Sequence, residues 1–173
     1  DENVAHGNAW RYRDYVVESL NQDKPYSEFL REQLAGDLLE SGDDYELRNV
    51  RLIATGYLVL GPKVLAEVDG NKMEMDIVDE QLDTIGRGLM GLTLGCARCH
   101  DHKFDPIGND DYYGLAGIFK STRAMETFEK VARWNENPIP TTADIAKEEQ
   151  HTAIISAKKE EISTLIASAS DEL

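Results

Sequence analysis

The sequence has few thiol and imidazole side chains, with two cysteines and four histidines in 173 residues. An iron–sulfur cluster needs more thiolates than two, so this class of site is excluded. No run of 18 apolar residues occurs, which argues against a membrane-spanning helix. The sequence also lacks a Ser-His-Asp order, a phosphate-binding loop and paired carboxylates at catalytic spacing. We therefore assign no catalytic residue and leave open whether the protein is an enzyme.

Basic residues are scarce as well, with 18 Lys and Arg against 33 Asp and Glu. The net charge of −15 argues against nucleic acid or an anionic membrane surface as a partner. It suits a solvated acidic surface or docking to a basic redox partner. The length is enough for one domain with a core of its own, and for an appendage.

The two cysteines and one histidine form a C-x-x-C-H motif at Cys96, Cys99 and His100. This is the attachment pattern of a c-type haem. Two thiols at this spacing can form thioethers to one porphyrin, and the imidazole of the next residue then lies under the iron as proximal ligand. The sequence therefore predicts haem c at these residues.

Other interpretations fit the same residues less well, and one is that the two cysteines form a structural disulfide or remain free thiols. A redox dithiol usually follows a strand in a thioredoxin-like βαβ unit, and no such strand pattern precedes Cys96. Cys96, Cys99, His100 and His102 could form a zinc site, but all four lie within seven residues. Tetrahedral zinc sites usually take their two ligand pairs from separate segments.

Helical periodicity dominates the chain, and no segment has the pattern of a sheet. The apolar spacing and the helix-breaking residues predict helices over 8–22, 26–39, 45–60, 75–94, 110–119 and 142–168. We expect a loop over 63–74 and an irregular segment over 123–140. The last helix is rich in Lys and Glu, with an imperfect apolar repeat, and we expect a helical hairpin arm or a coiled-coil segment there.

The predicted helix before the motif is unusually rich in glycine, at Gly86, Gly88, Gly91 and Gly95. Each glycine inside a helix costs up to about 1 kcal/mol relative to alanine. A close neighbour would justify this cost, because glycine lets a second helix or the flat face of a porphyrin approach the backbone.

Other residues are candidates for the surroundings of the haem. Arg98 and Lys103 flank the motif and could pair with propionates. His102 could hydrogen-bond a propionate or bind another metal, but we expect first that it supports the loop through Asp101 or Asp105. For the distal iron ligand we expect Met125 first, because a loop and one helix separate it from the motif. His6 comes second, on a segment before the first helix, and an open or water-ligated iron is the third alternative.

Several blocks of the sequence, including the motif, resemble a domain of large exported proteins from planctomycete bacteria. These blocks are 1–15, 31–37, 54–57 and 91–107, within a resemblance that covers about residues 1–135. The family is described as planctomycete cytochrome-associated and is usually flanked by a cytochrome c module and a second C-terminal domain. The resemblance implies export to the periplasm or beyond and a haem context. It also implies that the chain is a fragment, with the N-terminal part of the family domain missing.

Taken together, the sequence predicts an all-α protein: a compact helical domain around the haem site over 1–140, and a charged helical or coiled-coil arm over 141–173. We expect electron transfer through one covalent haem c, within a multi-domain exported protein. The expected partner is a redox protein or an adjacent cytochrome domain, and the arm would pack on the parent protein or a partner. One alternative is a haem enzyme or sensor with an open sixth position. The other is a zinc-stabilised binding or assembly module of a polysaccharide-related protein.

Overall fold

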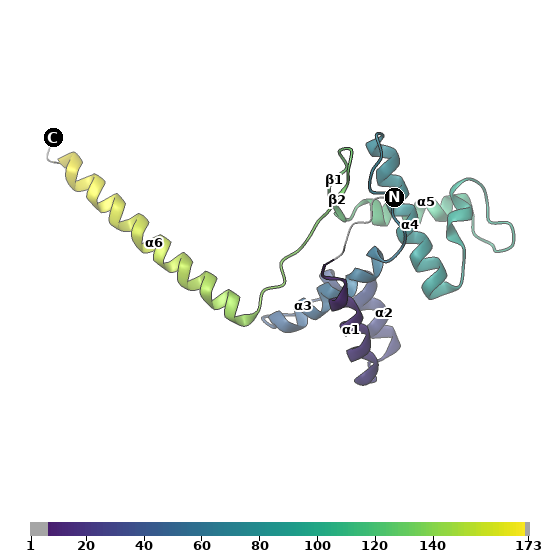
Figure 1. Cartoon of the computed structure of the whole chain (residues 1–173), viewed down its shortest axis with the longest axis horizontal. Helices are drawn as coiled ribbons and strands as arrows, with labels where there is room; N and C mark the ends of the chain where they lie inside the picture. The colour runs from purple at the N-terminus through teal and green to yellow at the C-terminus, as the bar shows by residue number, and fades with distance from the viewer. Residues whose placement is uncertain (1–6, 172–173) are drawn as a thin grey trace. The chain divides into compact units, whose positions relative to one another are not determined.

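The structure, a computed structural model, describes residues 7–171. The described part is mostly helical, which confirms the all-α character predicted from the sequence (Figure 1). Its helices are α1 (Ala9–Asn21), α2 (Tyr26–Ala35), α3 (Tyr45–Ala54), α4 (Gly70–Ile85), α5 (Asn109–Lys120) and α6 (Thr142–Asp171). The antiparallel strands β1 (Met125–Thr127) and β2 (Arg133–Trp134) form a small hairpin within the segment expected to be irregular.

The described residues divide into two compact units. The first unit contains 7–39 and 50–137, and the second contains 40–49 and 138–171. The motif at 96–100 lies in the first unit. The second unit consists largely of α6.

Helix α4 begins five residues earlier than the periodicity predicted, because Asp69 caps it. The Asp69 carboxylate accepts hydrogen bonds from the backbone N–H groups of Asn71 (3.0 Å) and Lys72 (3.1 Å). The helix also ends earlier than predicted, at Ile85. One π-helical turn, Gly86–Met90, follows it, and Gly91 ends this turn in the left-handed conformation with φ 68°.

Two apolar clusters form the core of the first unit, and α4 contributes to both. The first cluster contains Val78, Leu82, Ala97, Tyr112 and Ala116, so it joins α4 to α5 and to the middle of the motif. The second cluster contains Met73, Ile77, Met125 and Ala132, so it joins α4 to the hairpin. The centre of this unit is therefore filled by its own side chains.

A buried carboxylate ties α1 to α2. Glu32 is 1% exposed and forms an ion pair with Lys24. It also accepts a hydrogen bond from the Tyr15 hydroxyl at 2.9 Å, and the Arg51 Nε atom lies 3.7 Å from its other oxygen. Burial and the bond to Glu32 raise the pKa of Tyr15 above its usual value. These partners compensate the cost of burying the carboxylate.

Two of the four glycines before the motif, Gly86 and Gly88, are explained by protein neighbours, whereas no atom lies within 4 Å of a Cβ added at Gly91, which has a positive φ. A Cβ atom on Gly86 would lie 2.7 Å from the Leu94 Cγ atom. A Cβ atom on Gly88 would overlap the hydroxyl of Tyr57, which donates a hydrogen bond to the carbonyl of Thr84 at 2.8 Å. The close neighbour expected from the sequence is therefore the segment that carries Tyr57 and the turn that carries Leu94.

We expect Gly88→Ala to destabilise the protein by about 1–3 kcal/mol, because the new methyl group displaces the Tyr57 hydroxyl from its bond to Thr84. Thermal unfolding followed by circular dichroism measures this effect. Gly114→Ala in α5 is the matched control, since no atom lies within 4 Å of its added Cβ atom. That control should be neutral or stabilising by up to about 1 kcal/mol. Equal melting temperatures for the two variants would contradict the packing at Gly88.

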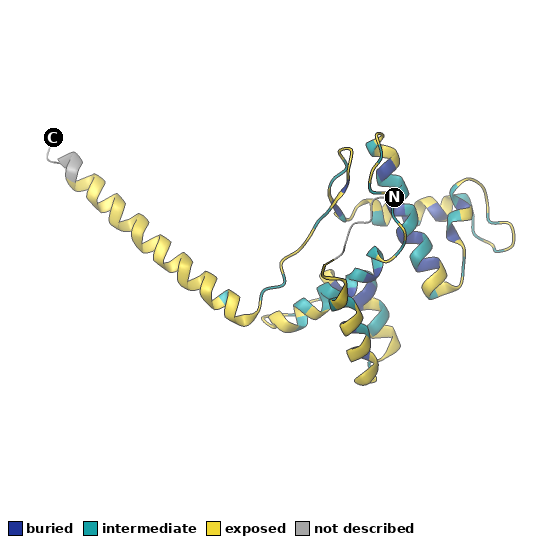
Figure 2. Ribbon diagram, in the orientation of Figure 1, coloured by how far each residue is buried: buried dark blue, intermediate teal, exposed yellow. Residues whose placement is uncertain are grey.

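Helix α6 is a single uninterrupted helix of 30 residues, so the hairpin form of the expected arm is not present in the described chain. Nearly all of its described side chains are exposed (Figure 2). Its large exposed apolar residues are Ile154, Ile155, Ile162, Leu165 and Ile166. At 100° per residue these five fall within about one third of the helix circumference. The part of α6 from Ile154 to Ile166 therefore carries an apolar stripe that its own unit does not cover.

Candidate functional site

The motif begins on a short 3-10 turn, Leu94–Arg98, three residues after the π-helical turn, and Cys99 and His100 follow the end of the 3-10 turn. The residues of this segment differ in burial. Ala97 is fully buried in the first apolar cluster, whereas Cys96, Cys99 and His100 are exposed. Both cysteines are free thiols. The structure thus brings the three predicted haem-binding residues together on the surface, while the residue between the cysteines anchors the turn.

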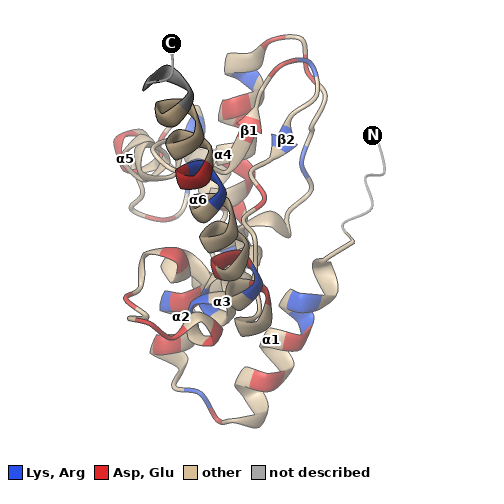
Figure 3. Cartoon of the chain, turned by 90° about the vertical axis from the view of Figure 1, so that its left-hand side faces the viewer, with Lys and Arg blue, Asp and Glu red and all other residues tan. Residues whose placement is uncertain are grey.

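An arginine connects the motif to α4. The Arg98 guanidinium forms ion pairs with Asp76 (2.8 Å) and Asp79 (3.3 Å), and the Tyr112 hydroxyl donates a hydrogen bond to Asp79. Burial and this hydrogen bond raise the pKa of Tyr112 above its usual value. Figure 3 shows the Lys and Arg residues in blue against the Asp and Glu residues in red. The predicted propionate partner Arg98 is therefore already paired with α4.

The pairing of Asp76 with Lys72 and Arg98 makes stability depend on pH. Hydrogen bonds from Lys72 and Arg98 hold the pKa of Asp76 below its usual value. A carboxyl group with a lowered pKa stabilises the fold above its unfolded pKa, near 3.9, and loses this contribution as the pH falls through the lower folded value.

We therefore expect Asp76→Asn to cost about 1 kcal/mol at pH 7 and less at pH 2, because protonation of wild-type Asp76 as the pH falls removes the same charge. Urea unfolding at the two pH values measures the difference. Asp83→Asn is the control, because Asp83 pairs with the exposed Arg87 of the adjoining π-helical turn. A penalty for Asp76→Asn that is the same at both pH values would show that its pKa is not lowered.

Helix α5 holds the end of the turn. The side-chain amide of Asn109 donates to the carbonyls of Ala97 (2.8 Å) and Arg98 (3.1 Å), and the Tyr113 hydroxyl donates to the Arg98 carbonyl (3.1 Å). The backbone N–H of Asn109 donates to the Asp101 carboxylate at 2.9 Å. Sequence reasoning missed Asn109 and Tyr113, because no local pattern relates α5 to a turn 11 to 15 residues earlier.

The two histidines after the cysteines have different hydrogen-bond partners. His100 Nδ1 lies 2.8 Å from the backbone carbonyl of Asp101, so Nδ1 carries the proton and donates it. His102 Nδ1 accepts the backbone N–H of Asp105 at 3.0 Å, and its Nε2–H donates to Thr93 Oγ1 at 3.2 Å. The geometry assigns opposite neutral tautomers to the two rings.

His102 supports the loop, as expected from the sequence. Its side chain is only 6% exposed, and the Asp105 carboxylate lies 3.2 Å from Nδ1. Because the Asp105 N–H already occupies Nδ1, the Asp105 carboxylate becomes an ion-pair partner only when the ring is protonated. The neighbouring Lys103 lies over the ring of Phe104, with Nζ 5.0 Å from the ring centroid.

The residues of the motif fit a covalently attached haem. Attachment needs two free thiols, and proximal ligation needs an imidazole nitrogen with a free lone pair. Cys96 and Cys99 supply the thiols. His100 supplies Nε2, since its proton lies on Nδ1. A hydrogen bond from the other ring nitrogen to a carbonyl is typical of metal-binding histidines.

The structure places Met125, the first predicted distal ligand, in another part of the core. Met125 is 4% exposed and packs in the second apolar cluster, beside Met73 and Ile77. His6 lies outside the described residues. Among residues 7–171, no group of three or more His, Cys, Asp and Glu side chains converges as a metal site, so the geometry lends no support to the zinc alternative.

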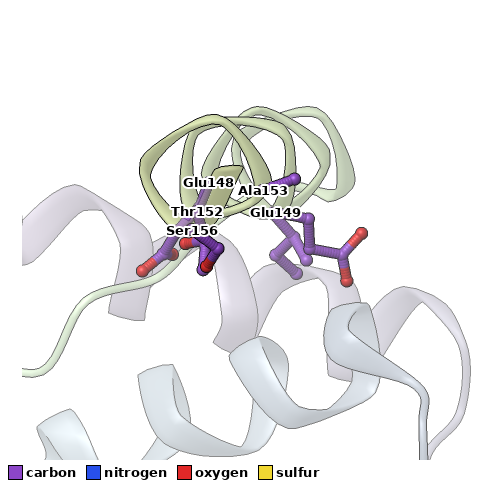
Figure 4. A pocket seen from close by; sticks show the side chains of 6 residues that line it. Glu148, Glu149, Thr152, Ala153 and Ser156 are labelled. Carbon is purple, nitrogen blue, oxygen red and sulfur yellow. The ribbon is translucent and has the colours of Figure 1, made fainter. Parts of the chain in front are cut away.

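Two hollows of the described surface are lined by none of the motif residues. One hollow is lined by six side chains of α6 alone, among them Glu148, Glu149 and Thr152 (Figure 4). Another lies between the first turn of α4 and the hairpin, and its charged lining, Asp69, Glu74, Glu126 and Glu129, is acidic. In the described chain no helix is long and apolar enough to cross a membrane.

A family model matches residues 1–124, which is more than half of the chain and includes the whole motif. Its description is PSCyt2, protein of unknown function (DUF1549). The match ends one residue before Met125 and excludes the hairpin and α6. Comparison with curated proteins and with solved structures finds no match.

Proposed function

The chain belongs to the PSCyt2 family, a planctomycete cytochrome-associated domain family of unknown function, and from this premise we propose that it is a c-type cytochrome domain. Cys96 and Cys99 would hold one haem through thioethers, and His100 would be its proximal ligand. When bound, the haem supplies one-electron chemistry. The protein would serve electron transfer within a larger exported protein.

One observation carries this proposal: two free, exposed thiols lie next to an imidazole whose Nε2 lone pair is available. The turn exposes Cys96, Cys99 and His100 while it buries Ala97. The hydrogen bond from His100 Nδ1 to the Asp101 carbonyl leaves Nε2 as the only nitrogen that can bind iron. In the described chain no other group bonds to Nε2.

The exposure of the motif agrees with exchange of electrons across a surface. A haem bound there would lie at the edge of the first unit, within reach of a partner. The net charge of −15 favours a basic redox partner or an adjacent domain of opposite charge. Haem attachment by thioethers takes place outside the bacterial cytoplasm, so the proposal includes export.

A haem enzyme or sensor with an open sixth position is the second candidate. The packing of Met125 favours it, because a methionine that is 4% exposed in an apolar cluster is not available to iron without disrupting that cluster. Binding of carbon monoxide or cyanide to the reduced or oxidised haem separates the two candidates. Rapid binding indicates an open position, whereas slow or absent binding indicates a protein ligand.

The test of the proposal is expression with export in cells that mature c-type cytochromes. We expect the purified chain to keep its Soret band after denaturation in acid and organic solvent, and its mass to equal that of the polypeptide plus one haem. Expression in the cytoplasm, without maturation, is the control and should yield the bare polypeptide. A colourless polypeptide of bare mass from the exporting cells would overturn the proposal.

A further inference from the structure

The first turn of α5 fixes the backbone on both sides of Cys99 and His100. Before these residues, the Asn109 amide holds the carbonyls of Ala97 and Arg98 at 2.8 and 3.1 Å. After them, the Asp101 carboxylate accepts the Asn109 backbone N–H at 2.9 Å. One residue of α5 therefore bonds to the chain on either side of the proposed proximal ligand.

The hydrogen bond between Asn109 and Asp101 also orients the Asp101 carbonyl, which is the hydrogen-bond partner of the His100 ring. The Asp101 carbonyl accepts the proton of His100 Nδ1 at 2.8 Å, and the carboxylate of the same residue is held by α5. Rotation of the Asp101 peptide would break the bond to the ring. The hydrogen bond between Asp101 and Asn109 opposes that rotation, because it fixes the Asp101 side chain.

We infer that Asn109 and Asp101 are positioning residues that fix the tautomer of His100 and thereby prepare Nε2 to bind iron. This inference rests on the proposed function for its purpose, although the tautomer itself exists without haem. Partners of this kind typically change metal affinity or activity by about 10- to 100-fold when they are removed.

The tautomer of His100 can be measured in the haem-free protein. Long-range proton–nitrogen correlation spectra of ¹⁵N-labelled histidine distinguish Nδ1–H from Nε2–H rings at a pH where both rings are neutral. In the wild type we expect His100 as Nδ1–H and His102 as Nε2–H. His102 is thus an internal reference for the fold of the loop.

Asn109→Ala removes both amide bonds, and Asp101→Ala removes the carboxylate that holds α5. In both variants we expect His100 to become a mixture of tautomers while His102 stays Nε2–H. Asp101→Asn keeps an acceptor oxygen for the Asn109 N–H, so His100 should stay in the Nδ1–H form. Asn71→Ala, at an exposed asparagine in the first turn of α4, is the matched control and should change neither ring.

In the haem-loaded protein, Asn109→Ala should raise the midpoint potential, because a ring that no longer donates from Nδ1 is a poorer electron donor to iron. The experiments test the positioning role and the proposed function independently of each other. If His100 stays Nδ1–H in both alanine variants, the positioning role is wrong, whatever the wild type binds. If the wild type takes up no haem but the tautomers shift as expected, the proposed function fails while the positioning of the ring stands.

Discussion

The double variant Cys96→Ala, Cys99→Ala will contain no covalently bound haem, and it will still fold. Each thioether needs one of the two thiols, and the chain has no other cysteine to replace them. Both side chains are exposed, and the core of their unit is filled by residues such as Leu82 and Met73. Surface substitutions of this kind change the free energy of unfolding by about 0.5 kcal/mol or less.

Two measurements check this prediction on protein from cells that mature c-type cytochromes. The denatured double variant should show the bare polypeptide mass and no Soret band, and its far-ultraviolet circular dichroism should match that of haem-free wild type. The single variants are the controls, because each keeps one thiol and should keep part of the haem. A haem-free double variant that is unfolded would show that the thiols contribute to the core.

Leu82→Ala is expected to be the most damaging of the apolar truncations near the motif. Leu82 is fully buried, at 0% exposure, in the cluster that contains Ala97, the residue between the two cysteines. Truncation of a buried leucine leaves a cavity and typically costs about 2–5 kcal/mol. This is a large part of the stability of an ordinary domain. The turn that carries the motif should loosen as well.

Chemical denaturation gives the free energy of unfolding, and the rate at which a thiol reagent modifies Cys99 reports on the turn. Leu38→Ala is the matched control, because Leu38 lies in the same unit and is 78% exposed. It should change stability by about 0.5 kcal/mol or less. A cost below 1 kcal/mol for Leu82→Ala would mean that α4 does not pack beneath the motif as described.

The sequence was a good guide where structure is local. Periodic apolar residues located all six helices of the described chain, and α5 and α6 begin within one residue of the predicted positions. The start of α4 was missed because capping by Asp69 allows a helix to begin in a stretch without apolar periodicity. Its end was missed because a π-helical turn continues the apolar pattern beyond Ile85.

The site was predictable only as far as the motif itself. The spacing of Cys96, Cys99 and His100 is a local signal, and the structure exposes all three side chains together. The supporting contacts are long-range, such as those from Asn109 to the turn and from Arg98 to Asp76, 22 residues earlier. The expectation for Met125 rested on the number of residues between it and the motif. That number is large enough for Met125 to reach the iron, but it does not prevent Met125 from being buried in another cluster.

The position of α4 has a consequence for the way the first unit opens. Ile77 faces the hairpin cluster and Val78 faces the motif cluster, so adjacent residues of one helix belong to both halves of the core. Neither half can separate from the other while α4 stays intact. The backbone amides of α4 should therefore exchange with deuterium only when both clusters open, and protection of the hairpin and of α5 should disappear in the same cooperative step.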